Sequence, residues 1–393
     1  MQKVPGSLLL LVLCSVLLPA EAGHEMPYYP SYYPQEIRIE AMPPETAATR
    51  LQNNTLHAFI GGAPPFGETM PANVRAVETL GAYLVVTLNS AAPPWSHAEV
   101  RCALVQQMLD TLGAADGTYV FHPYPVTPYH WDYLHHVDRV ETARMRVLQH
   151  GRPSVNQALH IRARGKLAEH LVQSRWPGEG EGWDAMIEEV ALDDLLAPHT
   201  TNLNGWLGPP WVKEGWFHAY LLLAPTIGDQ AVQERAAAAY ERLVQEHSGE
   251  RAAQLNAERD LVALLLSGCE RAIVGYTMRR DYFNTDFSAG IENLAYDAHT
   301  GFNSAIFLRT VKLKDFPWNG WLRLGVSTTP SAAWNPVGGF TDATGRLIWH
   351  AVGDPALFPA PYSGSWTLNR IGEYQSTIGS LRPAVPVQGM DKP

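Results

Sequence analysis

The sequence predicts an α/β protein with a helical middle region and a β-rich C-terminal part. Near the N-terminus, a run of alternating apolar and polar residues (36–42), a helix-forming stretch and a short apolar run (56–60) follow one another with short connections. This order is typical of an α/β layer with parallel strands. Residues 230–266 are rich in Ala, Glu and Arg and are predicted to form helices with solvated charges. Two later segments, 291–313 and 338–352, each place an Asp/Thr/Gly turn between β-type runs, which favours strands.

The N-terminal unit is predicted to alternate strands and helices. Its first strand, EIRIEAM at 36–42, alternates as a half-buried strand does. Pro43 and Pro44 open the next helix, because proline is tolerated in the first helical turn. Further strands are predicted at 56–60, which ends at a Gly-Gly pair, and at 82–88, and a helix is predicted at about 97–112.

The middle of the chain repeats this order loosely. An amphipathic helix is predicted at 154–173, and the WPGEGEG stretch at 176–182 interrupts the pattern, because glycine and proline punctuate secondary structure. WDAMIEEVALDDLLA (183–197) is then predicted to form a strand and a short helix, and WFHAYLLLAP (216–225) another strand. The sequence thus predicts a second α/β stretch that leads into the helical region.

The N-terminus has the layout of a secretory signal peptide. Lys3 precedes an apolar run at 8–18, and the small residues Ala20 and Ala22 follow it. The apolar run is too short to span a bilayer, so we expect cleavage after Ala22, export to the periplasm or beyond, and no membrane span in the mature chain. The alternative is a retained N-terminal anchor.

Four regions follow from these boundaries. Without the signal peptide, the length of the mature chain suggests two or three domains. The predicted regions are the signal peptide at 1–22, an α/β domain with a Tyr/Pro-rich start and a His-rich loop at 23–150, a second α/β to helical region at 151–275, and a β-rich region at 276–393.

The charge balance excludes some classes of partner. The 393-residue chain has a formal net charge of −10 and no basic cluster. Nucleic acids and anionic membranes need Lys and Arg against their phosphates, so we expect neither as a partner. The expected partner is a small-molecule solute, a metal ion or another periplasmic protein.

Two of the three cysteines, Cys102 and Cys269, lie in the predicted mature chain. Export would permit a long-range disulfide between them. Both have apolar, helix-like flanks, which are equally compatible with buried free thiols. The sequence leaves the two alternatives open.

One family resemblance rests on IRIEAMPPETAATRLQNNTLHAFIGGAPPF followed by AYLVVTL. Through this order of strand, helix and glycine-ended strand, about residues 36–112 resemble the type II periplasmic solute-binding proteins. The chain departs from that family at His57, where an aspartate is common, and upstream, where a Tyr/Pro-rich segment replaces the expected first strand and helix. The resemblance implies a ligand cleft lined by Gly61, Gly62 and Phe66, since the carboxyl ends of strands face the crevice in open α/β sheets.

Residues 121–141 (FHPYPVTPYHWDYLHHVDRVE) concentrate imidazole and carboxylate groups. Imidazoles bind divalent metals, and a carboxylate can bind the metal or fix a ring tautomer. The spacing matches no established zinc motif, and packing between domains is the alternative use of such a loop. The candidate metal ligands are His122, His130, Asp132, His135 and His136, and the cofactor would be a divalent metal.

Tryptophans in the loop NGWLGPPWVKEGW mark a second candidate contact surface. Trp206 and Trp211 stand beside glycine and proline, and exposed tryptophans are costly unless they pack on something. They are candidate ligand contacts, with packing between domains as the alternative.

The sequence therefore predicts an exported, non-catalytic solute-binding or accessory protein for an unidentified ligand. The sequence contains no GxSxG, SxxK or Cys-His signature of nucleophilic catalysis. Two alternatives stay open. One is a metal-dependent enzyme centred on the stretch from His122 to Asp138, and the other is a non-catalytic subunit of a periplasmic complex.

Overall fold

A computed structural model of the chain describes most of the predicted mature protein. The predicted signal peptide, the Tyr/Pro-rich start up to residue 33, and Trp206 lie outside the described residues. None of the helices in the described part of the chain combines the length and the apolar composition needed to cross a membrane. The described residues are 34–91, 94–113, 117–149, 159–176, 182–200, 210–245, 251–286, 288–315, 320–331, 340, 342–353, 356–363 and 366–369.

The described residues form strands, α-helices and short 3-10 helices with the following bounds. The strands are β1 (Glu36–Ala41), β2 (Ala58–Ile60), β3 (Val74–Leu88), β4 (Val120–Phe121), β5 (Ile161–Arg164), β6 (Ala185–Ala191), β7 (Arg271–Asn284), β8 (Ile291–Asn293), β9 (Lys312–Leu313), β10 (Trp321–Val326), β11 (Leu357–Pro359) and β12 (Trp366–Leu368). The helices are α2 (Pro44–Gln52), α3 (Ala98–Gly113), α4 (Val137–Gln149), α5 (Lys166–Arg175), α6 (Leu192–Thr200), α7 (Gly215–Leu223), α8 (Gln230–Gln245), α9 (Arg251–Leu265), α10 (Ala305–Thr310), α11 (Ala343–Val352), η1 (Tyr133–His135), η2 (Pro210–Lys213) and η3 (Ala224–Thr226).

The main sheet is mixed and confirms the predicted α/β class. Seven of its eight strands lie in the order β1-β10-β2-β7-β3-β6-β5, and the eighth, β4, pairs with β7. The pairs β1–β10, β10–β2 and β5–β6 are parallel, whereas β2–β7, β7–β3 and β3–β6 are antiparallel. β1 and β2 are parallel as predicted, but β10 from the C-terminal region lies between them.

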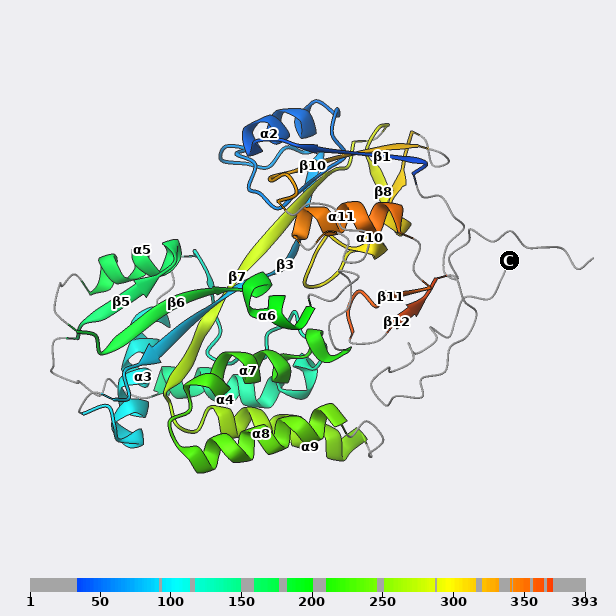
Figure 1. Cartoon of the computed structure of the whole chain (residues 1–393). Helices are drawn as coiled ribbons and strands as arrows, with labels where there is room; N and C mark the ends of the chain where they lie inside the picture. Colours follow the sequence, from blue (N-terminus) through cyan, green and yellow to red (C-terminus); the bar gives the residue numbers. More distant parts are fainter. Residues whose placement is uncertain are drawn as a thin grey trace, which may run out of the picture.

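The long strands β3 and β7 run through two lobes of the molecule (Figure 1). The upper lobe (the described residues within 34–78 and 281–369) contains α2, β1, β2, β10, α10 and α11, and the lower lobe (the described residues within 80–279) contains β5, β6 and helices α3 to α9. Val77 of β3 packs with Phe302 in a core of the upper lobe, whereas Leu84 of β3 packs in a core of the lower lobe. The lobes therefore have separate hydrophobic cores on shared strands.

A β-bulge at Gly81 lies where β3 passes from one lobe to the other. Leu80 pairs with Met278 and Ala82 with Thr277, so Gly81 is the extra residue on β3. A Cβ atom at this position would lie 3.1 Å from the backbone nitrogen of Arg279. Glycine permits this close approach of the two strands, and bulges bend the strand that carries them. Gly81 is therefore a natural point of bending between the lobes.

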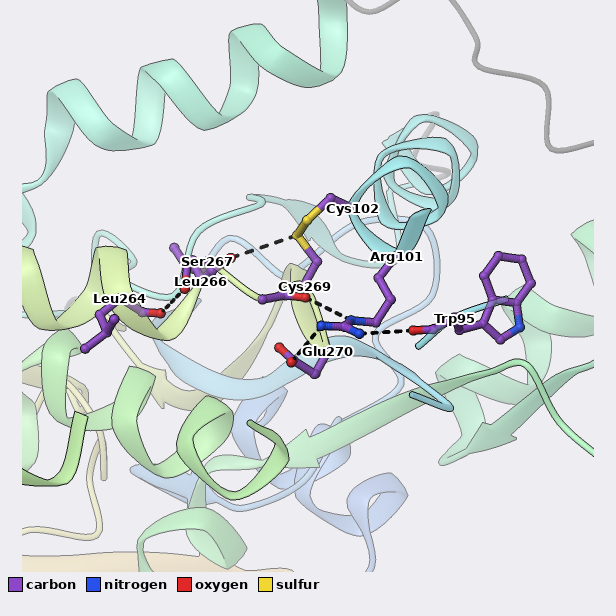
Figure 2. The surroundings of a disulfide bond; sticks show 9 residues. Trp95, Arg101, Cys102, Leu264, Leu266, Ser267, Cys269 and Glu270 are labelled. Carbon is purple, nitrogen blue, oxygen red and sulfur yellow. Dashed lines mark hydrogen bonds and ion pairs between the residues drawn. A yellow bond between two sulfur atoms is a disulfide. The ribbon is translucent and has the colours of Figure 1, made fainter. Parts of the chain in front are cut away.

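A disulfide joins Cys102 of α3 to Cys269, just before β7 (Figure 2). This resolves the alternative that the sequence left open in favour of the disulfide. Beside it, the Arg101 guanidinium lies 2.9 Å from the carboxylate of Glu270, and both side chains are buried. Arg101 also donates a hydrogen bond to the carbonyl of Gly268 at 3.0 Å. A buried polar link thus reinforces the covalent one.

Three segments that are predicted to form strands contain helices instead. One is 291–313, in which α10 (Ala305–Thr310) lies between the short strands β8 and β9. Residues 216–225 contribute to α7, because a short apolar run fits a fully buried helix as well as a strand. Within 338–352, α11 begins after Asp342, whose side chain accepts a hydrogen bond from the backbone N–H of Gly345 at 2.8 Å. This N-cap, and not a turn between strands, explains the Asp/Thr/Gly motif there. The C-terminal region accordingly contains helices beside its short strands.

The predicted helix at 154–173 is also wrong over part of its length. Residues 161–164 form β5, and α5 begins only at Lys166. Gly165 lies between them with a φ of 104°, a conformation that interrupts a helix and that glycine adopts at low cost. Its positive φ could not be seen in the hydrophobic pattern.

Candidate functional site

A group of polar side chains is buried where the two lobes meet, and we call it the interlobe cluster. It consists of Tyr83 of β3, His130 of the loop before η1, His218 of α7 and His299 of the turn before α10. Relative exposure is 0% for Tyr83 and His218, 4% for His130 and 3% for His299. His299 belongs to the upper lobe and the other three residues to the lower lobe.

Hydrogen bonds to the backbone fix the tautomers of two of these histidines. The N–H of Thr127 donates to Nδ1 of His130 at 2.7 Å, so a neutral His130 carries its proton on Nε2. Nε2 of His218 lies 2.7 Å from the carbonyl oxygen of Val212. Because a carbonyl only accepts, His218 carries its proton on Nε2 and presents the lone pair of Nδ1 to the cluster.

Tyr83 connects the two rings. Its hydroxyl oxygen lies 3.0 Å from Nε2 of His130 and 2.8 Å from Nδ1 of His218. With the tautomers above, the Nε2–H of His130 is shared between the Tyr83 hydroxyl and Nδ1 of His218, which is 2.9 Å away, and Tyr83 donates to His218. A chain of hydrogen bonds with one direction therefore runs from the N–H of Thr127 to the carbonyl of Val212.

His299 lacks comparable support. Among the described residues, neither of its ring nitrogens makes a hydrogen bond of good geometry, although the backbone of Tyr129 lies close enough to raise its pKa slightly. The centre of its ring lies 5.2 Å from that of His218 and 5.7 Å from that of His130. A buried polar group without a partner costs roughly 1–3 kcal/mol. The cluster therefore favours a further group that pairs with His299.

The three imidazoles are held in their neutral form. Burial lowers the pKa of His218 to about 4. Burial and the neighbouring histidines lower the pKa of His130 well below its ordinary value. For His299, burial and His218 lower the pKa, against smaller opposing effects of Asp297 and the Tyr129 backbone. The rings are thus available as neutral hydrogen-bonding groups or metal ligands at neutral pH.

An ion pair crosses the lobe boundary beside the cluster. The ammonium of Lys213, in the lower lobe, donates to the carboxylate of Asp297 and to the carbonyl of Ala360, both in the upper lobe. Both charged side chains are buried. Burial raises the pKa of Asp297, but Lys213 and His299 outweigh this effect and hold the pKa below its ordinary value. The pair holds the lobes together in this conformation.

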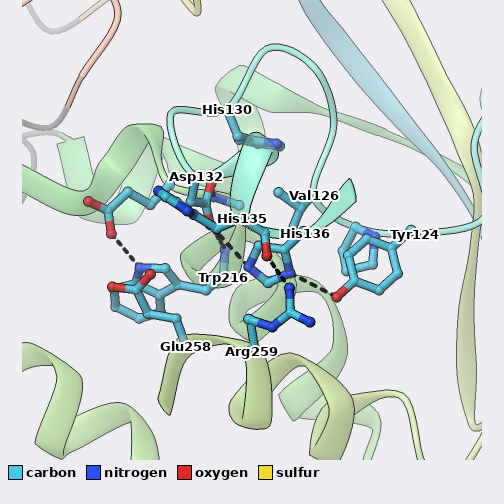
Figure 3. Close-up of polar contacts among 12 residues, drawn as sticks. Tyr124, Val126, His130, Asp132, His135, His136, Trp216, Glu258 and Arg259 are labelled. Atoms are coloured by element: carbon cyan, nitrogen blue, oxygen red, sulfur yellow. Dashed lines mark hydrogen bonds and ion pairs between the residues drawn. The ribbon is translucent and has the colours of Figure 1, made fainter. Parts of the chain in front are cut away.

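The histidine-rich stretch distributes its side chains over several places (Figure 3). Nε2 of His122 lies 2.8 Å from the carbonyl oxygen of Val126, and Nδ1 of His136 lies 2.9 Å from the hydroxyl of Tyr124. Of the five predicted metal ligands, the structure brings only His130 into the interlobe cluster.

Asp132 and His135 of the predicted set meet elsewhere, in a recess that also includes Glu214. Asp132 caps α7, because its carboxylate accepts hydrogen bonds from the backbone N–H groups of Gly215 at 2.7 Å and Trp216 at 3.2 Å. Burial and the carboxylate of Glu214 raise the pKa of Asp132 to about 7. The position of Asp132 therefore has a structural explanation in the start of α7.

The predicted ligand contacts lie on two different parts of the molecule. Gly61 and Gly62 follow β2, and Phe66 packs against Tyr282 with ring centres 5.6 Å apart. Trp211 is 9% exposed and belongs to the core of the lower lobe. The packing alternative therefore fits Trp211, whereas the three upper-lobe residues stay candidates.

Several cluster residues were not singled out from the sequence. Tyr83 and His218 lie within apolar runs, where a single polar residue is usually part of the core. His299 lies in the AYDAHTG segment, which was interpreted as a turn. The only signal in the sequence was a single polar residue within an otherwise apolar run, and this signal is weak.

No family model and no curated protein matches this chain. Solved structures with a partial likeness include solute-binding proteins. HbpA2 from Haemophilus parasuis has a TM-score of 0.40 at 12% identity, over 68% of this chain and 56% of that one. The oligopeptide-binding protein AppA from Bacillus subtilis, in complex with a nonapeptide, has a TM-score of 0.37 at 12% identity, over 68% and 58%. NikZ from Campylobacter jejuni, in complex with Ni(L-His), has a TM-score of 0.38 at 12% identity, over 69% and 60%. The chain spans less than two thirds of the length of each of these proteins.

Proposed function

We propose that this chain is an exported, non-catalytic solute-binding protein that holds its ligand between the two lobes. The observation that carries the proposal is His299, a buried imidazole at the lobe boundary whose ring nitrogens make no hydrogen bond of good geometry within the described residues. Polar groups in such a position are usually satisfied by a ligand or by water.

The architecture supports this proposal. Two lobes with separate cores share the strands β3 and β7, and the bulge at Gly81 lies between the cores. Proteins that close around a ligand bend at a few hinge residues, which are often small, as glycine is. The Lys213–Asp297 pair would then form as the lobes close.

The predicted cleft residues are connected to the same boundary. The carboxylate of Asp281 accepts a hydrogen bond from the backbone N–H of Gly61 at 3.2 Å and from that of Phe302 at 2.9 Å. Phe302 follows the turn that carries His299. We therefore retain Gly61, Gly62 and Phe66 as proposed contacts of a larger solute, next to the interlobe cluster.

Export is supported by two independent features of the chain. The N-terminus has the layout of a signal peptide, and the Cys102–Cys269 disulfide is typical of proteins that mature in an oxidising compartment. N-terminal sequencing of the secreted chain should find a start at or near Gly23. Recovery of Met1 on the exported chain would contradict this part of the proposal.

A thermal-shift screen of the mature chain tests the binding function. Organic acids, amines, peptides, oxyanions and metal ions are added one class at a time, and an active solute at a hundredfold excess over Kd should stabilise the protein by about 2.7 kcal/mol. His299→Ala and Phe66→Ala should reduce the shift in melting temperature. His160→Ala, at a half-exposed histidine, is the control and should leave the shift unchanged. A screen in which no class changes the melting temperature would contradict solute binding and favour the partner-subunit alternative.

A further inference from the structure

We propose that the group bound at the interlobe cluster is a divalent transition-metal ion, held by ring nitrogens of His218, His299 and His130. This inference rests on the proposed solute-binding function, because it names the chemical class of the solute. It also replaces most of the metal site predicted from the sequence, of which only His130 remains.

The geometry of the three rings suits a small ion. Each histidine offers one ring nitrogen, and these nitrogens all lie within 4.8 Å of one another. Nitrogens bound at about 2.0–2.1 Å to a tetrahedral ion are roughly 3.3 Å apart. Nε2 of His130 and Nδ1 of His218 are already 2.9 Å apart. Side-chain adjustments of about 1 Å would therefore bring the set to coordination distances.

The ligand types indicate the class of metal. Neutral imidazoles bind zinc, nickel, cobalt and copper, whereas calcium and magnesium require sets of oxygen ligands. The carboxylate of Asp297, two residues before His299, is already held by Lys213 and by the backbone N–H groups of His299 and Thr300. The site therefore favours a borderline-soft transition metal over a hard cation.

His218 and His299 are prepared for coordination. His218 donates its Nε2 proton to the carbonyl of Val212, which directs the lone pair of Nδ1 into the cluster. A metal bound there would replace the hydrogen bond that Nδ1 accepts from Tyr83. A hydrogen bond from the second ring nitrogen to a backbone carbonyl is the usual support of a metal-bound histidine. His299 gives up no hydrogen bond of good geometry within the described structure when a metal binds.

His130 is the ligand whose proton must move. Its Nε2 carries a proton, because Nδ1 accepts from the Thr127 N–H. Coordination through Nε2 moves this proton to Nδ1, where the Thr127 hydroxyl, 3.1 Å away, can accept it, and the Thr127 N–H loses its acceptor. Metal binding is therefore coupled to a change in the turn from Thr127 to His130, and His130 contributes less than the other two ligands.

The placement of the ligands connects the metal to lobe closure. His299 comes from the upper lobe, and His130 and His218 come from the lower lobe. An ion that binds all three can do so only when the lobes are together. The metal would thus stabilise the closed form beside the Lys213–Asp297 pair.

Metal titration of the full mature chain tests this inference. The chain is treated with a chelator, and Zn²⁺, Ni²⁺, Co²⁺ or Cu²⁺ is added before desalting and elemental analysis. We expect about one ion per chain, a higher melting temperature, and with Co²⁺ the visible absorption of nitrogen coordination. His299→Ala and His218→Ala should each weaken binding at least about tenfold, and His130→Ala less.

Two further measurements keep the test decisive. His299→Ala is the main variant, because removal of an unpartnered ring should leave the fold intact, as circular dichroism can verify. His57→Ala is the matched control, since His57 is also buried and its Nε2 also lacks a partner. Metal content that survives in both His299→Ala and His218→Ala, or no binding of any of the four ions, overturns the metal inference.

The outcomes separate this inference from the proposed function. If organic solutes raise the melting temperature and no metal binds, solute binding stands and the metal inference fails. If metal binds through His218 and His299 but small-angle scattering shows no compaction, the metal site stands and ligand capture by lobe closure fails.

Discussion

The hydroxyl oxygen of Tyr83 lies between two buried histidines, 2.8 Å from Nδ1 of His218 and 3.0 Å from Nε2 of His130. Tyr83→Phe would remove both hydrogen bonds of the hydroxyl but leave the two nitrogens, 2.9 Å apart, to pair directly, so the loss should be about 0.5–1.5 kcal/mol, the usual contribution of a hydrogen bond. We expect urea unfolding to show this decrease in the free energy of unfolding. Tyr220→Phe is the control, because Tyr220 is only half-buried and stacks on Tyr240. Equal effects of the two substitutions would contradict the directed chain.

Removal of only one partner of the Lys213–Asp297 ion pair should strongly lower the free energy of unfolding. Asp297→Ala leaves the Lys213 ammonium buried beside the carbonyl of Ala360, and an uncompensated buried charge typically costs about 3–5 kcal/mol. Removal of both charges in Lys213→Met/Asp297→Leu should restore part of the stability. A double-mutant cycle from urea unfolding measures the coupling, and additive losses in the double variant would contradict a direct pair.

The disulfide should add stability through the long segment that it closes. Cys102 and Cys269 are 167 residues apart in sequence, and loss of a native disulfide typically costs about 2–5 kcal/mol, mainly because the unfolded chain regains freedom. Cys102→Ser/Cys269→Ser should therefore lower the free energy of unfolding. Dithiothreitol should destabilise the wild type and leave the double variant unchanged. Equal sensitivity of both proteins to the reductant would contradict the assignment.

The elements with regular periodicity were predictable from the sequence. The N-terminal strand and helix, the helix at 97–112 and the helical region at 230–266 are confirmed, because each combines a clear pattern with a capping or breaking residue. The helix α7 was missed, because an apolar run of nine residues has no polar face from which a period can be read.

The interlobe cluster could not be predicted, because its members come from segments far apart in the chain. Tyr83, His130, His218 and His299 come together only in the folded structure, in which β3 and β7 pair across the lobe boundary. A local concentration of histidines drew attention to residues 121–141, but most of these rings are used for local hydrogen bonds. Local density of a residue type therefore identified one cluster residue and missed the long-range partners.

Acid should destabilise the chain through His57. Burial, and then Arg323, lower its pKa from 6.5 to about 4, against a raising effect of Asp315. The unfolded chain binds a proton at higher pH than the folded chain, so this contribution is fully present above pH 6.5 and is lost as the pH falls toward 4. Between pH 6.5 and 4, this titration should lower the free energy of unfolding by about 3 kcal/mol.

Urea unfolding at several pH values checks this effect. His57→Asn places an amide oxygen where Nδ1 accepts from the backbone N–H of Arg323 and removes the titration. The variant should therefore show a smaller loss of stability between pH 6.5 and 4 than the wild type. Identical pH profiles for the two proteins would show that His57 is not the titrating group.

Gly81 should tolerate a side chain poorly, because the bulge brings β3 close to β7. A Cβ atom would lie 3.1 Å from the backbone nitrogen of Arg279 and 3.2 Å from the backbone carbon of Met278. Backbone atoms paired in a sheet cannot easily retreat, so Gly81→Ala should cost about 1–3 kcal/mol. Gly228→Ala is the matched control, since a Cβ there would meet only the Glu270 carboxylate, at 3.9 Å. If Gly81→Ala proved as stable as Gly228→Ala in urea unfolding, the close approach of β3 and β7 at the bulge would be contradicted. The bending point between the lobes would then have to lie elsewhere on these strands.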